Sequence, residues 1–211
     1  MIFQKFPSGP LDTNAILFGC SETKQVVVID PAHESTPEIL AEVEENGLTV
    51  QAILLTHSHW DHIADVAELK RKTNAPVYIH PLDVGNLENP GSDGIPLFFP
   101  IHGIKPDFLL QEGRSIQLGN LIIQVIHSPG HSPGSVCFYV PERSILFSGD
   151  TLFQGTIGTL NLPTAQPAKM WDSLRKLSLL PPETHVVPGH GADTTIEDES
   201  WLERAEEIFK D

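Results

Sequence analysis

Cysteine and basic residues are scarce in this sequence of 211 residues, which has two cysteines and 13 lysines and arginines against 28 aspartates and glutamates. The net charge of −15 would repel a nucleic-acid backbone, and no dense basic cluster offsets it, so we expect no nucleic-acid partner. Cys20 and Cys137 each lie in an apolar, strand-like run. This position favours two buried free thiols over a disulfide.

Long hydrophobic runs are also missing. No segment approaches the roughly 18 consecutive apolar residues of a membrane helix, so we expect no membrane partner. Residues 1–14 lack the basic stretch followed by an apolar run that marks a secretory signal, and we therefore expect a cytoplasmic protein. Because no linker or low-complexity tract divides the chain, we predict one domain over residues 1–211.

The apolar runs are separated by polar turns and amphipathic segments, and they form two similar halves. Each half is predicted to contain strands followed by helices: strands at 13–19, 25–30, 50–55 and 77–80 with helices at 37–46 and 64–72, then strands at 115–117, 121–127, 135–140, 144–148 and 185–187 with helices at 168–177 and 201–209. Segment 89–105, rich in proline and glycine, is predicted to be a mobile loop of the length typical of functional lids. Two sheets packed face to face with helices outside form an α/β fold, a four-layer αββα sandwich.

Histidine is abundant, with ten residues, and the segment Thr56–His62 concentrates three of them with one aspartate directly after an apolar strand. His57 and His59 are two residues apart, so in an extended turn they point to the same side. Asp61 and His62 can then face a second point. Imidazole nitrogen combined with carboxylate oxygen suits zinc, iron or manganese. A run of ordinary surface residues would not explain the abrupt change from apolar strand to consecutive ligands.

Further candidate ligands close strand-like runs in the second half. His131 lies between two Pro-Gly turns, Asp150 ends the run at 146–150, and His190 ends the run at 186–190. Each alone could be a loop histidine or a turn aspartate, but together with the first cluster they predict a metal site. A Ser-His-Asp triad using Ser132 or Ser148 is disfavoured because the histidines already have this role.

The order of these motifs, Thr-His-x-His-x-Asp-His, Pro-Gly-His, Ser-Gly-Asp and Pro-Gly-His, resembles the metallo-β-lactamase superfamily and especially its glyoxalase II (hydroxyacylglutathione hydrolase) branch, over residues 11–191. The resemblance implies two divalent metal ions, zinc first, with iron or manganese as alternatives. It implies one site made by His57, His59 and His131, a second made by Asp61, His62 and His190, and Asp150 as the bridge between them. Asp30 resembles the family's aspartate that orients the cluster, although an ordinary Asp-Pro turn explains it equally well.

The activity that the resemblance implies is hydrolysis of a small thioester substrate such as S-lactoylglutathione. A hydroxide shared by the two metals would attack the carbonyl carbon, while one metal polarises the carbonyl oxygen and the other stabilises the leaving group. Asp61 and Asp150 would be the catalytic carboxylates. Zinc β-lactamases are expected to have a cysteine near the bridging position, so Asp150 argues against a β-lactamase.

The chain departs from full-length glyoxalase II in the parts that recognise glutathione. Only residues 191–211 follow His190, so we expect the helical domain that helps to bind glutathione to be missing. Thr159 and Asn161 stand where glyoxalase II is expected to have a lysine and a tyrosine, and the Gly-Arg-x-Asp pattern of the short hydrolases is not matched either. These two residues are predicted to be weak substrate contacts, and glutathione recognition stays open.

Other functions compete with the hydrolase interpretation. A persulfide dioxygenase of the same superfamily would use a single iron held by His57, His131 and Asp150. An RNA-processing nuclease is disfavoured by the acidic charge, and a metal-binding protein without catalysis by the complete ligand set. His102, in the long loop, could touch substrate, and four histidines have no assigned role: His33, His80, His127 and His185.

Overall fold

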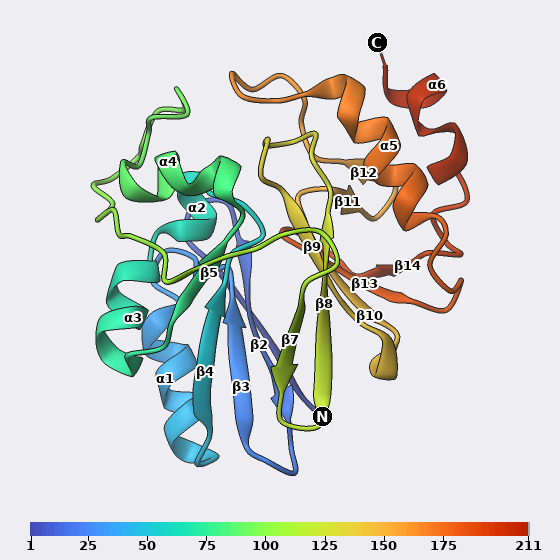
Figure 1. The fold of residues 1–211 in the computed structure, drawn as a ribbon. Coiled ribbons are helices and arrows are strands. Elements are labelled where there is room, and N and C mark those ends of the chain that lie inside the picture. The colour runs from blue at the N-terminus through green and yellow to red at the C-terminus, as the bar shows by residue number, and fades with distance from the viewer. Residues whose placement is uncertain (211) are drawn as a thin grey trace.

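The computed structural model describes residues 1–210 and contains two mixed six-stranded sheets (Figure 1). In the first sheet the strands lie in chain order, antiparallel from β1 to β3 and parallel from β3 to β6. Its strands are β1 (Ile2–Ser8), β2 (Thr13–Cys20), β3 (Gln25–Ile29), β4 (Thr49–Leu54), β5 (Val77–Ile79) and β6 (Phe108–Leu109).

The second sheet has the order β14-β13-β10-β9-β8-β7, and only the pair β10 and β13 is parallel. A separate short hairpin, β11 (Leu152–Phe153) with β12 (Thr156–Ile157), follows β10. The strands of the second sheet are β7 (Ser115–Leu118), β8 (Leu121–His127), β9 (Val136–Val140), β10 (Ile145–Gly149), β13 (His185–Pro188) and β14 (Thr194–Thr195).

The central core lies between the two sheets and is built from alternate residues of their strands. Phe18 of β2, Phe138 of β9 and Phe147 of β10 are fully buried there. The residues that alternate with these along each strand face outward and pack under helices. Leu17 of the first sheet and Leu146 of the second are examples. Both faces of each sheet are therefore covered, which explains why these strands read as continuous apolar runs.

Helices cover the outer face of each sheet. The first sheet carries α1 (Thr36–Glu45), α2 (Trp60–Ile63), α3 (Val66–Thr73) and α4 (Val84–Glu88), and the second carries α5 (Pro167–Leu177) and α6 (Ala205–Phe209) (Figure 1). Helix α5 starts with a proline and buries one apolar stripe. This arrangement confirms the predicted four-layer αββα sandwich.

Several elements differ from the prediction. The chain opens with β1, which was missed because this edge strand is only half-buried and contains Pro7. The helix predicted at 64–72 is split into α2, which begins inside the ligand motif, and α3. The break falls at Asp65, whose backbone nitrogen donates to the carbonyl of Pro31 at 3.1 Å instead of to the preceding helical turn. Its buried carboxylate accepts hydrogen bonds from the backbone of Glu34 and Thr36. The terminal helix predicted at 201–209 is a 3₁₀ turn at Leu202–Arg204 followed by α6.

Two further predictions can be compared with the structure. Both cysteines are buried and free, as expected. The segment predicted as a loop at 89–105 contains no helix or strand within the described chain. None of the helices in residues 1–210 is long and apolar enough to cross a membrane.

Candidate metal centre

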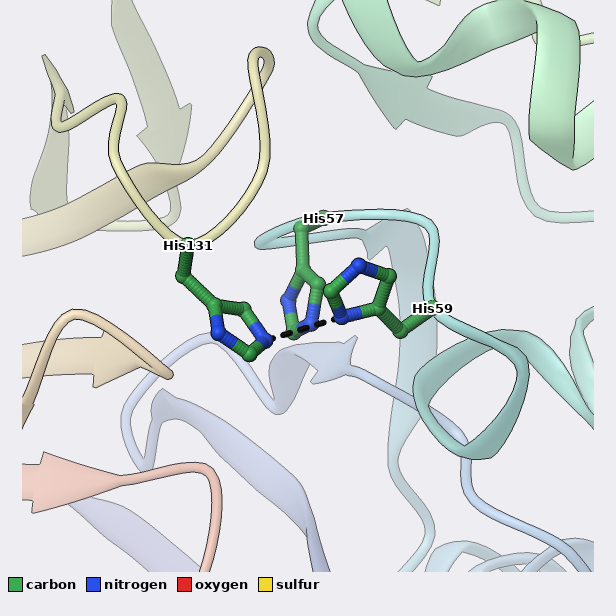
Figure 2. A group of neighbouring side chains, drawn as sticks. All are labelled: His57, His59 and His131. Carbon is green, nitrogen blue, oxygen red and sulfur yellow. Dashed lines mark hydrogen bonds between the residues drawn. The ribbon is translucent and has the colours of Figure 1, made fainter. Parts of the chain in front are cut away.

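Three histidines from two loops far apart in the sequence converge on one point (Figure 2). His57 and His59 lie in the loop that follows β4, and His131 lies in the loop between β8 and β9. The Nδ1 atom of His59 is 2.8 Å from the Nε2 atom of His131, and all three side chains are buried. As predicted, His57 and His59 point to the same side of their loop.

A second group lies beside the first and contains Asp61, His62 and His190. Asp61 and His62 belong to α2, and His190 follows β13. One carboxylate oxygen of Asp61 is 3.3 Å from His62 Nε2 and 3.2 Å from His190 Nε2. Each of the two groups thus combines residues from both halves of the chain.

Asp150 lies between the two groups. Its Oδ1 atom is 3.3 Å from His62 Nε2, and its Oδ2 atom is 3.3 Å from His131 Nε2. Gly149, which precedes it, has a φ of +50°, and a Cβ atom there would lie 2.6 Å from the Thr56 side chain. This turn, which only glycine fits, directs Asp150 into the cluster. Its Oδ1 faces the second group, and its Oδ2 lies between the groups, 3.6 Å from His190 Nε2.

The cluster contains buried polar atoms without a hydrogen-bond partner among the described residues. They include the Nε2 atoms of His57 and His62 and the Oδ1 atom of Asp150. Such atoms are costly to bury alone, and nitrogen and carboxylate oxygen are the donors that zinc and iron accept. The donor set therefore fits two metal ions.

Hydrogen bonds behind the cluster fix the orientation of three imidazole rings. The Nδ1 atom of His62 donates to Asp30 Oδ2 at 2.9 Å, that of His131 to the carbonyl of Thr159 at 3.0 Å, and that of His190 to the carbonyl of Leu11 at 3.0 Å. Each bond places the Nδ1 proton on the side of the ring away from the cluster, so that Nε2 faces the cluster and is the atom that a metal ion would bind.

Asp30 occupies the position that the orienting role needs. It also accepts hydrogen bonds from the backbone nitrogen of Thr56 at 2.8 Å and from its hydroxyl at 2.5 Å. Its φ of +49° is uncommon for a residue with a side chain, and it is buried. These contacts favour an orienting residue over an ordinary turn, and its effect on metal binding stays a prediction.

Sequence reasoning missed two residues that hold the ligand loops. Asp83, after β5, is buried and accepts hydrogen bonds from the backbone of Ser58 at 2.9 Å, the hydroxyl of Ser132 at 2.9 Å and the backbone of Gly134 at 2.7 Å. It thereby joins the His59 loop to the His131 loop. The Thr13 hydroxyl donates to Asp61 at 2.7 Å. For Asp83, the one sequence signal for this supporting role is its position after a parallel strand that ends at the same sheet edge.

The two groups differ in their affinity for protons. Burial, reinforced by neighbouring histidines, holds the pKa of His57 well below its usual value and lowers the pKa of His59 to about 3. Burial alone would also lower the pKa of His190, but the carboxylates of Asp150 and Asp61 raise it to about 9. The pKa of His62 is raised as well, because Asp61, Asp150 and Asp30 outweigh its burial.

Metal loss on acidification is expected to begin at the Asp61–His62–His190 group. Because the pKa of His190 is about 9 and the pKa of His62 is also raised, metal binding there must displace protons. The His190 proton alone lowers the apparent affinity about tenfold per pH unit as pH drops from 8 to 6. His57 and His59 are neutral throughout this range. Metal content after dialysis against a chelator should decrease from two ions to one per chain, and simultaneous loss of both would contradict this order.

Two cavities adjoin the cluster and share His131, Asp150, Thr159 and His190. One, of about 230 Å³, extends toward Trp60 and Phe98, and the other, of about 450 Å³, toward Phe153 and Thr156. Of the two predicted substrate contacts, Thr159 lines both cavities. Asn161 lines neither of these two cavities, but together with Thr159 it lines a third cavity, of about 610 Å³, against α5.

Comparison with known proteins agrees with this geometry. Residues 8–190 match the family described as the metallo-beta-lactamase superfamily. A relative from Bacillus subtilis named "Probable metallo-hydrolase YqgX" is 35% identical over 199 residues, covering 93% of each chain. The chain belongs to the metallo-β-lactamase superfamily, and its ligand set is that of a metal-dependent hydrolase.

Relatives within the superfamily differ in their named activities. A hydroxyacylglutathione hydrolase from Cereibacter sphaeroides is 38% identical over 180 residues, which cover 85% of this chain but only 62% of that protein. The crystal structure of TTHA1623 in a di-iron-bound form has a TM-score of 0.81 and 42% identity, covering 93% of this chain and 96% of that one. The crystal structure of BLEG-1 B3 metallo-beta-lactamase has a TM-score of 0.87 and 38% identity, covering 94% and 96%.

Proposed function

We propose that the protein is a binuclear metallohydrolase that cleaves a small thioester or a similar ester. The observation that carries the proposal is the position of Asp150, whose carboxylate lies between the two ligand groups and contacts residues of both. When bound, two metal ions at such a site activate a water molecule and polarise a carbonyl group. The chain itself supplies imidazole rings whose Nε2 atoms face the cluster, a carboxylate between the two groups, and a site that is largely buried from solvent.

The alternative of a persulfide dioxygenase needs only His57, His131 and Asp150 for a single iron. It would leave the Nε2 atom of His62 buried without a partner and the Asp61–His62–His190 group without a role. This second group is the reason to favour two metals. We propose zinc as the metal in the cell, and the di-iron form of TTHA1623 supports iron as the alternative.

The thioester assignment is supported by the hydroxyacylglutathione hydrolase relatives, of which the chain spans 62%. A second candidate is β-lactam hydrolysis, because BLEG-1, described as a B3 metallo-beta-lactamase, has the same fold at 38% identity. That similarity weakens the argument from Asp150 against a β-lactamase. A nucleic-acid substrate remains disfavoured by the net charge of −15.

The deciding experiment is metal analysis of the purified protein combined with four assays on the same sample: hydrolysis of S-lactoylglutathione, of a neutral thioester and of a β-lactam, and oxygen uptake with glutathione persulfide. We expect two metal ions per chain and thioester turnover that His59→Ala reduces by at least about a hundredfold. One iron per chain with oxygen uptake and no hydrolysis would overturn the proposal. Two metals with β-lactam turnover alone would move it to the second candidate.

A further inference from the structure

We propose that the substrate carries an uncharged, apolar acyl group, which lies in the cavity of about 230 Å³ beside the cluster. This inference rests on the proposed hydrolase function and names its substrate class. The cavity, called the acyl pocket below, has an apolar wall formed by Leu11, Trp60, Ile95, Phe98 and Leu162.

The acyl pocket is placed where a reacting carbonyl must lie. Its remaining lining residues belong to both ligand groups or lie next to them: His59, Asp61, His131, Asp150, Thr159 and His190. A group held against the apolar wall therefore presents its carbonyl to the position between the two groups. Positioning of this kind is what converts binding into rate.

Aromatic contacts form the wall of the acyl pocket. Trp60 is only 4% exposed, and its ring centroid lies 5.0 Å from that of Phe98 and 5.6 Å from that of Phe99. Phe99 in turn stacks on His33 at 3.8 Å, which holds this part of the long loop on the first sheet's side of the site. The loop thus has an anchor directly beside the pocket.

Phe98 itself is 74% exposed, which is unusual for a ring next to an active-site cavity. An apolar group that enters the pocket covers the Phe98 ring and removes it from water. This burial contributes a binding free energy of about 25 cal/mol per Å² of apolar surface. An exposed apolar side chain at the rim of a polar metal cluster therefore favours apolar over polar acyl groups.

The charges around the site disfavour recognition of an anionic substrate by ion pairing. No lysine or arginine lines either cavity beside the cluster among residues 1–210. The third cavity, against α5 and also lined by Thr159, contains Arg175 and Lys210, which are paired with Asp172 and Glu206. Lys5, whose ammonium group reaches the carbonyl of Gly191 near the larger cavity, is paired with Asp193 at 2.6 Å. The carboxylates of a glutathione thioester would find no partner there, and the protein's net charge of −15 would oppose them.

The larger cavity suits the thiol half of the substrate. It holds about 450 Å³ and presents Gln154, Thr156 and Thr159, which are polar and uncharged, beside Phe153. Hydrolysis consumes one water molecule, breaks the bond between carbonyl carbon and sulfur, and releases a carboxylic acid and a thiol. The acid would leave from the acyl pocket and the thiol from the larger cavity.

The test uses the metal-loaded full-length protein and thioesters that share the neutral thiol N-acetylcysteamine, with acetyl, butyryl, hexanoyl, phenylacetyl and succinyl groups. We expect kcat/KM to rise about fourfold per added methylene group until the pocket is full, and succinyl to be poorer than butyryl. Lactoyl-N-acetylcysteamine should be cleaved at least as well as S-lactoylglutathione. A flat acyl series, or a clear preference for the succinyl or glutathione thioester, would overturn the inference.

Variants separate this inference from the hydrolase proposal. Phe98→Ala should compress the ratio of hexanoyl to acetyl kcat/KM by about fivefold or more through KM, and Phe98→Leu should restore part of it. Leu179→Ala, at another exposed apolar residue far from the site, should leave the ratio unchanged. Hydrolysis with an unchanged ratio in Phe98→Ala would refute the acyl pocket alone, whereas no turnover of any thioester would refute the hydrolase proposal itself. An unchanged ratio with an altered oligomeric state would assign Phe98 to an interface instead.

Discussion

Asp150→Ala is expected to lower kcat/KM for the best thioester by at least about a thousandfold and to reduce the metal content below two ions per chain. Asp150 contacts both ligand groups: its Oδ1 is 3.3 Å from His62 Nε2, and its Oδ2 is 3.3 Å from His131 Nε2 and 3.6 Å from His190 Nε2. Its removal leaves His190 paired with Asp61, and His62 paired with Asp61 and Asp30. Elemental analysis and steady-state kinetics on the same preparation measure both effects.

Asp172→Ala provides the matched control for this variant. Asp172 is an exposed aspartate on α5 that pairs with Arg175, so its loss should change neither metal content nor turnover. If Asp150→Ala keeps two metals and normal kinetics, Asp150 does not bridge them, and the proposed mechanism fails with it.

Asp30→Asn is expected to weaken metal binding at the Asp61–His62–His190 group by about tenfold to a hundredfold. The carboxylate accepts three hydrogen bonds, from His62 Nδ1 and from the backbone and hydroxyl of Thr56. An amide of the same shape presents hydrogens where at least one acceptor was needed, so the His62 ring loses its fixed orientation. Competition with a chelating dye measures the change in affinity.

Backbone strain does not confound this variant, because asparagine tolerates a positive φ about as well as aspartate does. Asp12→Asn is the control, since Asp12 has the same φ of +49° but is exposed. In thermal unfolding of the metal-free proteins, Asp12→Asn should match the parent, whereas Asp30→Asn should unfold at a lower temperature because a buried hydrogen bond is lost. Metal affinity is therefore compared well below both unfolding temperatures. Equal metal affinity in Asp30→Asn and the parent would show that Asp30 is only a turn residue.

The ligand set could be predicted from sequence because each ligand follows a strand whose apolar pattern is local. Asp150 comes directly after β10, and His57 and His190 follow β4 and β13 within three residues. The ends of these strands meet at one edge of the fold. The same strands are apolar on both faces, so each sheet must be covered on both sides. This requirement predicts the four layers.

The supporting contacts could not be predicted because they join segments with no shared local pattern. Asp83 contacts Ser132 across 49 residues, and Thr13 contacts Asp61 across 48. Asn161 was paired with Thr159 by its place in the motif, but only Thr159 lines the two cavities beside the cluster, whereas both residues line the cavity against α5. The acyl pocket depends on how the loop around Phe98 folds over Trp60, which spacing does not encode.

Each ligand group takes residues from both halves of the chain: His57 and His59 with His131, and Asp61 and His62 with His190. Each bound metal ion would therefore form a cross-link between the first and the second half of the chain. A ligand that binds only the folded state adds its binding free energy to folding, about 4 kcal/mol when its concentration is a thousand times its dissociation constant. The same ions that equip the protein for chemistry would keep its two sheets together, so that metal starvation would threaten the lifetime of the molecule as well as its turnover.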